Sequence, residues 1–347
     1  MASSLSALRP VNEILSQLAV EAGSTLNEQL IADKVFEKIQ LDEGQFTGTI
    51  LVENSRNYMG AGGADVNFKR SPGAARARLD GFDFTTLTFQ TEAHGLEAAI
   101  AYEDLVSSQY PIDMKEREIR RITRALLLER EVNAANLLFG TSNWTGYNNT
   151  LSTFNSSVNT DANGTQWNST GAEPLIDLFA LADTVRANSH GIMPDTLVMG
   201  HRCFRALQSS PDVLGLVGST NNGLSNAGRR IVSQPAAIEV LKEQLGIPNI
   251  FVGTARRETA NPYQTSSEAQ IWTDDSIFCG IMRGSDAVVN RGQVKAAPLA
   301  AVCLENFGMK SGEEPYKDIR TDVWVEHRYQ DKILSANYGY LLTDILA

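Results

Sequence analysis

Residues 46–89 read FTGTILVENSRNYMGAGGADVNFKRSPGAARARLDGFDFTTLTF, and this stretch decides the fold. It opens on a β-branched, apolar run at 46–52 and closes at 82–89, where Phe and Leu alternate with polar residues as in a half-buried strand. Between the two runs lie a glycine- and asparagine-rich segment and a basic segment. The pattern predicts a long two-stranded hairpin with a polar tip and few residues that could build a core.

This predicted hairpin is too small to be stable by itself. Two strands without a third strand or a covering helix are marginal in water. Its tip carries the densest basic patch of the sequence, formed by Lys69, Arg70, Arg76 and Arg78, and arginine is favoured at protein interfaces. We therefore expect the tip to contact acidic groups on neighbouring subunits, with a solvated loop as the alternative.

Residues 1–43, before the hairpin, are predicted to form an arm. Leu15 and Leu18 belong to an apolar group with helical spacing, and a second short apolar group at 30–39 includes Phe36. Neither group is long enough to form a stable isolated helix. We expect both to be ordered only by burying these side chains against an adjacent subunit.

Residues 112–139 give the clearest helix prediction. Asp113 is a suitable N-cap, Glu116 follows three residues later as in a capping box, and Gly140 ends the apolar periodicity. At 1.5 Å per residue the helix is about 40 Å long, enough to span a domain.

The charged residues of this helix alternate in sign between its apolar positions. Arg117, Arg120 and Arg121 are among them. Such alternation is typical of a solvated face or of an interface, so these three arginines are further candidates for contacts between subunits.

In the second half of the chain, predicted helices and strands alternate as in a compact α/β unit. Residues 141–171 are predicted to be a polar loop, and the tail is predicted to be a strand hairpin that turns at Gln330 and Asp331. Helices are predicted at 174–188, 201–210 and 234–246, and strands at 196–200, 249–255, 268–273, 277–282 and 300–308.

Composition narrows the function. The net charge is −11, from 41 acidic and 30 basic residues, which disfavours sequence-specific binding of nucleic acid. The three cysteines are widely spaced and are expected to be buried thiols. The start lacks the features of a signal peptide and no run is long enough to span a membrane, so we expect a cytosolic product without membrane contact.

No motif for chemistry is present. Walker A, G-x-S-x-G and HExxH patterns are absent from the sequence. His201 and Cys203 are close in sequence, but such neighbours on a helix do not face each other, and Asp274 with Asp275 is predicted to form a polar turn. We expect no catalytic residues, no cofactor and no metal.

In order and texture, these segments resemble the major capsid proteins of tailed bacteriophages, over nearly the whole chain. LIADKVFEKIQLDEGQ (30–45) is similar to the family's arm, and FKRSPGAARARLDGFDFTTLTFQTEAHGLEAAIAYED (68–104) resembles the return strand of its extended loop and the passage to its long spine helix. HGIMPDTLVMGHRCFRALQSSPDV (190–213) is like the opening of its axial domain, and VWVEHRYQDKILSANYGYLL (323–342) resembles its terminal hairpin.

The resemblance implies the Hong Kong 97-like capsid fold, which is of the α+β class. Its parts would be an N-terminal arm, an extended β-hairpin loop, a peripheral domain whose spine helix is 112–139, a compact α/β axial domain, and return strands of the peripheral domain. In chain order these parts would cover 1–43, 44–92, 93–171, 172–312 and 313–347.

The resemblance also implies a function and partners. The chain would assemble with itself into pentamers and hexamers of an icosahedral shell, made in the host cytoplasm and enclosing double-stranded DNA that it contacts non-specifically. Because the arm begins almost at Met1, any scaffolding protein is expected to be a separate chain. A portal is expected as well, and a decoration protein is possible within the family.

Three other functions remain open. Encapsulin-type nanocompartment shells share the fold, so the shell could enclose enzyme cargo. The compact unit could belong to an oligomeric hydrolase with an unrecognised site, which a nucleophile and base side by side would favour. An adaptor that forms no closed particle is the third alternative.

Overall fold

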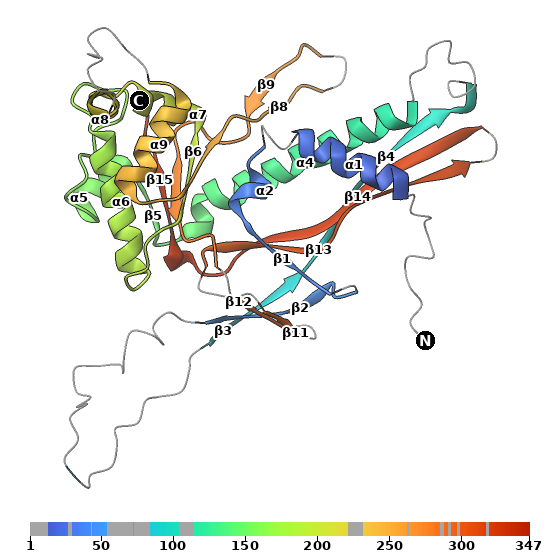
Figure 1. The fold of residues 1–347 in the computed structure, drawn as a ribbon, viewed down its shortest axis with the longest axis horizontal. Coiled ribbons are helices and arrows are strands. Elements are labelled where there is room, and N and C mark those ends of the chain that lie inside the picture. The colour runs from blue at the N-terminus through green and yellow to red at the C-terminus, as the bar shows by residue number, and fades with distance from the viewer. Residues whose placement is uncertain are drawn as a thin grey trace.

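The computed structural model describes residues 13–26, 30–42, 44–53, 72, 84–103, 114–220, 232–261, 264–284, 288–290, 293–296, 299–316 and 319–347. Figure 1 shows a compact, helix-rich unit at one end of the molecule and, extending away from it, a long helix that lies beside long strands. None of the described helices combines the length and the apolar character needed to cross a bilayer.

The elongated part is a four-stranded sheet covered by the spine helix. The sheet has the order β1-β13-β14-β4, with β1 parallel to β13 and the other neighbours antiparallel. Apolar residues of the spine helix α4, among them Ile119 and Ile122, pack on Val323 and Val325 of the sheet. The bounds are β1 Glu37–Gln40, β4 Glu92–Ala101, α4 Met114–Phe139, β13 Ala301–Tyr316 and β14 Arg320–Ile333. The predicted spine helix is confirmed from residue 114 onwards.

The compact unit is built on a five-stranded sheet of order β5-β15-β10-β6-β7. Its helices bury a second core against this sheet. The strands are β5 Asn148–Thr150, β6 Thr196–Gly200, β7 Asn249–Gly253, β10 Ile277–Gly280 and β15 Gly339–Thr343. The helices are α5 Leu151–Ser157, α6 Pro174–Asn188, α7 His201–Gln208, α8 Pro211–Thr220 and α9 Gln234–Leu245, with short 3-10 turns at Thr141–Trp144 and Ala336–Tyr338.

The predicted hairpin is present but has more strands than expected. Strands β2 (Thr47–Glu53) and β3 (Phe84–Gln90) pair antiparallel, as predicted. β12 (Gln293–Ala296) adds to β2 in parallel, and β11 (Val288–Asn290) completes a four-stranded sheet. The base of the hairpin therefore has partners from the same chain, which come from a segment that the sequence assigned to the axial domain.

The tail differs from its prediction. β14 runs without a break through Gln330 and Asp331, whose register partners on β13 are Leu304 and Cys303. The strands reverse between Tyr316 and Arg320 instead. The final strand β15 then leaves the peripheral sheet and pairs with β10 and β5 of the axial sheet, because its fully buried apolar run suits an interior strand.

The predicted polar loop at 141–171 is also more ordered than expected. It contains β5 and α5, and it buries Trp144, Phe154 and Trp167. Phe154 and Trp167 join the core of the axial unit, so this segment belongs with that unit and not with the peripheral sheet.

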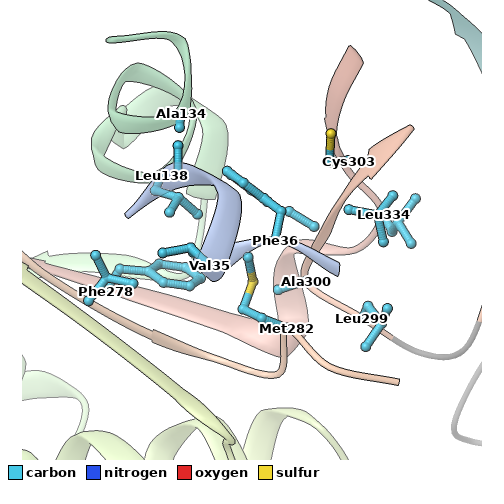
Figure 2. Packing of buried hydrophobic residues seen from close by; sticks show 14 of the residues in the cluster. Val35, Phe36, Ala134, Leu138, Phe278, Met282, Leu299, Ala300, Cys303 and Leu334 are labelled. Carbon is cyan, nitrogen blue, oxygen red and sulfur yellow. The ribbon is translucent and has the colours of Figure 1, made fainter. Parts of the chain in front are cut away.

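The arm folds onto its own chain, and the expectation that only a sister subunit could order it is wrong for residues 30–42. The one-turn helix α2 (Ala32–Val35) and strand β1 dock between the spine helix and β13. Val35 and Phe36 lie among Leu138, Met282 and Ala300 in the largest core cluster (Figure 2). Phe36 is only 1% exposed, because one short segment fills the gap between the two units of the chain.

Candidate functional site

The arm residues predicted to contact a neighbouring subunit are partly or wholly used within the chain. Phe36 has no surface left to offer a partner, which corrects its assignment as a contact residue. Leu15 and Leu18 lie on α1 (Glu13–Leu26) and are partly buried against the cluster that joins α4 to the peripheral sheet. Their contacts with another subunit stay a prediction that concerns only their remaining exposed surface.

The spine helix presents its predicted arginines to solvent. Arg120 pairs with Glu116 at 2.5 Å and Arg121 pairs with Glu118 at 2.8 Å, while Arg117 is exposed as well. Exposed pairs of this kind contribute little to stability, so these side chains are free to exchange partners at an interface.

The basic tip of the hairpin lies outside the described residues. Its contacts through Lys69, Arg70, Arg76 and Arg78 therefore stay a prediction.

A buried ion pair fastens the arm to the spine helix. Arg130 of α4 is 2% exposed, and its guanidinium lies 2.5 Å from the carboxylate of Asp33 in α2. The same side chain donates to the Cys303 sulfur at 3.2 Å and lies 4.9 Å from the centre of the Tyr329 ring. One cation thus holds together the arm, the spine helix and both central strands of the peripheral sheet.

The neighbouring Glu131 connects three parts of the chain. Its carboxylate accepts hydrogen bonds from the backbone N–H of Ala32 at 2.6 Å and from the indole N–H of Trp272 at 2.7 Å. Burial raises the pKa of this carboxyl, while the two hydrogen bonds oppose the rise. Because Trp272 belongs to the axial unit, Glu131 fixes the position of that unit relative to the arm and the spine helix.

A second buried pair lies across β13 and β14. The Glu305 carboxylate lies 2.6 Å from the His327 ring nitrogen and also accepts from Gln40 of β1 at 2.6 Å. Burial would raise the pKa of Glu305, but the hydrogen bond and charge of His327, together with Lys38 and Arg130, lower it to about 2.

We predict that this pair makes the free energy of unfolding of the subunit depend on pH in the acidic range. A carboxyl whose pKa falls from 4.5 to about 2 on folding contributes stability that is complete above pH 4.5 and is lost as the pH falls towards 2. Chemical unfolding of unassembled subunits between pH 5 and 2 measures this loss. Glu305→Gln should flatten the curve in that window.

His327→Leu is a second test of the same pair. It leaves the carboxyl but removes the ring whose hydrogen bond lowers its pKa, so it should also flatten the window. A Glu305→Gln subunit that loses stability as steeply as the unmodified chain would contradict the assignment.

The described residues show no arrangement for nucleophilic catalysis around Cys203. Its thiol donates to the carbonyl of Asp274 at 2.9 Å, and burial raises its pKa, so the reactive thiolate is disfavoured. Cys203, Cys279 and Cys303 are buried free thiols, as predicted. Asp274 and Asp275 form a turn, also as predicted. No group of three or more potential metal ligands gathers within the described ranges.

The sequence interpretation missed Arg130 and Glu131. Both occupy the inward face of α4, between Leu127 and Ala134, where an apolar stripe is interrupted by two adjacent charges. Such an interruption is the signal that could have indicated them, since buried charges occur in proteins almost only when paired.

Three solved structures, two related to phages and one from a virus-like particle, have a similar architecture. A phage-related protein from Bordetella bronchiseptica RB50 matches with a TM-score of 0.65 at 20% identity, over 97% of this chain and 98% of that one. A structure of Microbacterium phage Oxtober96 matches with a TM-score of 0.52 at 11% identity, over 91% of each chain. A virus-like particle from Pyrococcus furiosus matches with a TM-score of 0.51 at 11% identity, over 95% of this chain and 98% of that one.

The fold is therefore the α+β Hong Kong 97-like capsid fold. The sequence is similar to one curated protein that has a capsid role. The chain is 24% identical over 270 residues to the major capsid protein of Pseudomonas phage JBD67. The match covers 78% of this chain and 76% of that protein. No family model matches the sequence.

Proposed function

We propose that the chain is the major capsid protein of a tailed bacteriophage, a structural protein whose copies form the icosahedral head that encloses double-stranded DNA. The observation that carries the proposal is the similarity to a phage major capsid protein over most of the sequence, in a chain that has the capsid fold along nearly its whole length.

The shape of the subunit supports assembly into rings. The body is elongated, with the axial unit at one end and the long strands β13 and β14 extending away from it (Figure 1), so two copies side by side can meet through unlike parts. Contacts between unlike surfaces are heterologous, and they close into rings when the rotation between copies divides a full turn. Pentamers and hexamers assembled in the host cytoplasm, a separate scaffolding protein, a portal and non-specific contact with packaged DNA all belong to this proposal.

The encapsulin-type shell remains a second candidate, since a virus-like particle from Pyrococcus furiosus shares the fold. The contents of purified particles distinguish the two. Nuclease-protected double-stranded DNA in particles made during phage growth is expected for a capsid, while a defined enzyme cargo without DNA would favour the nanocompartment.

Electron microscopy of the purified protein tests the proposal directly. We expect closed shells of uniform diameter when the chain is expressed together with the other head proteins. Monomers or small oligomers under every condition would overturn the proposal and favour an adaptor or an unrecognised enzyme.

Deleting residues 55–78 is predicted to abolish shells without unfolding the subunit. Glu53 and Phe84 are register partners at the end of β2 and β3, so a short turn can join the two strands after the deletion. Circular dichroism should be close to that of the unmodified chain, and particles should be absent. A variant with a Gly/Ser segment of equal length at 55–78 separates the role of side chains from that of length, and normal particles from the deletion would contradict the prediction.

A further inference from the structure

A two-stranded ribbon projects from the axial unit as a free-standing pair of strands (Figure 1). It consists of β8 (Arg256–Glu258) and β9 (Glu268–Gln270), which within the described residues pair only with each other. All three residues of β8 are exposed. Because a two-stranded ribbon is marginal in water, a feature other than core burial must keep it in shape.

The carboxylate of Glu258 supplies this order. It accepts hydrogen bonds from the backbone N–H of Ala260 at 3.0 Å, from that of Ser267 at 2.6 Å, and from the hydroxyl of Ser266. The hydrogen bond from Ser266, followed by those from the backbone, lowers the pKa of Glu258 to about 2. Thr259 adds bonds from its N–H and its hydroxyl to the Ser267 carbonyl at 2.7 and 2.8 Å. An exposed element held in one shape loses little entropy when it binds a partner.

A pocket of about 340 Å³ separates this ribbon from the spine helix. Arg124 of α4 and Arg256 and Arg257 of β8 line it, and Leu30 and Leu128 add apolar surface. The pocket therefore brings together arginines that are far apart in the sequence, beside two leucine side chains.

The charges in the pocket leave two arginines available. Glu268 pairs with Arg256 at 3.3 Å, and the carboxylate of Glu258 already accepts hydrogen bonds within the ribbon. Arg124 and Arg257 form no ion pair with any residue in the part of the chain that the structure describes. Guanidinium groups bind carboxylates with two parallel hydrogen bonds, and nearby apolar surface strengthens such contacts by excluding water.

We propose that this pocket binds an acidic segment of a second copy of the chain during assembly, an inference that rests on the proposed shell function. The chain has an excess of acidic residues, with a net charge of −11, so each neighbour brings carboxylates to meet the two arginines. Closed shells also require heterologous contacts, in which a site on one copy meets a different segment of the next.

A DNA duplex fits the pocket less well than a peptide segment does. The volume accommodates a few side chains, whereas a duplex is far too wide to enter it. Phosphate binding is therefore an outcome of the test and not the proposal.

Charge reversal tests the inference. Arg124→Glu and Arg257→Glu should each fold as the unmodified subunit does, by thermal unfolding and circular dichroism, and each should lower the yield of shells about tenfold or more, as expected for a lost charge contact at an interface. Arg186→Glu is the control, since Arg186 is an exposed arginine of α6 that lies 3.1 Å from Asp183. It should assemble normally.

The other outcomes are decisive as well. Shells at normal yield from both pocket variants would overturn the proposal, and normal shells that contain less DNA would identify a phosphate site instead. If the unmodified chain forms no shells, the proposed function fails. The pocket can then still be judged by sedimentation, in which unchanged self-association of both variants would overturn it.

A cross-link identifies the occupant. All three native cysteines are buried, so Arg257→Cys places a single accessible thiol at the pocket for a maleimide photo-cross-linker. We expect a covalent dimer of the chain whose linked peptide, by mass spectrometry, is rich in Asp and Glu. Cross-links confined to one copy, or to nucleic acid, would overturn the inference.

Discussion

Replacing Arg130 by methionine is expected to lower the free energy of unfolding of the subunit by about 3–5 kcal/mol. Methionine fills much of the same space but leaves the Asp33 carboxylate, 2.5 Å from the guanidinium in the native chain, with one cation fewer, since only Lys38 at 3.0 Å stays beside it of these two. Asp331, whose pKa is raised by burial and lowered in part by Arg130, would lose the same cation. The cost comes from carboxylates that stay largely buried with less positive charge beside them.

Arg121→Met is the matched control on the same helix. Arg121 pairs with Glu118 at 2.8 Å, but its side chain is 73% exposed, so water replaces the lost partner and the expected loss is below about 1 kcal/mol. Denaturant unfolding of unassembled subunits, followed by tryptophan fluorescence, measures both. Equal losses from the two variants would show that burial does not govern the Arg130 pair.

Gly200→Ala is expected to destabilise the axial unit by about 3 kcal/mol. Gly200 ends β6 beside Gly253 of β7. A Cβ at this position would lie 2.2 Å from the carbonyl oxygen of Thr273 and 2.7 Å from the Cα of Asp274. Both are backbone atoms, so the overlap is relieved only by moving the turn at 273–275, which packs beside the sheet.

Gly215→Ala is expected to raise the stability of the subunit, in contrast to Gly200→Ala. Gly215 lies within α8, and a Cβ there would meet nothing within 4 Å. Alanine in a helix is more stable than glycine by up to about 1 kcal/mol, so this variant should unfold at a higher temperature than the unmodified chain. If the Gly200→Ala subunit unfolds at the same temperature as the Gly215→Ala subunit, the turn at 273–275 moves aside at little cost and the prediction is wrong.

Helices and strands that are marked by the periodicity of their own apolar residues were predictable from the sequence. The helix predicted at 174–188 coincides with α6, which has a proline in its first turn, and the strand predicted at 196–200 coincides with β6. The spine helix ends at Phe139, before Gly140, as its periodicity indicated. The resemblance to phage capsid proteins rests on the order of such elements, and the fold confirms it.

The amino-acid sequence alone thus determined the spine helix, several helices and strands of the axial unit, and the capsid fold that their order resembles. Only the tertiary structure decided their partners: β1 beside β13, β12 beside β2, β15 inside the axial sheet, and Arg130 beside Asp33. The reason is physical. Helical and strand periodicity reflects local backbone geometry, whereas strand neighbours and buried ion pairs join segments far apart in the chain, and nothing in either segment by itself specifies the other.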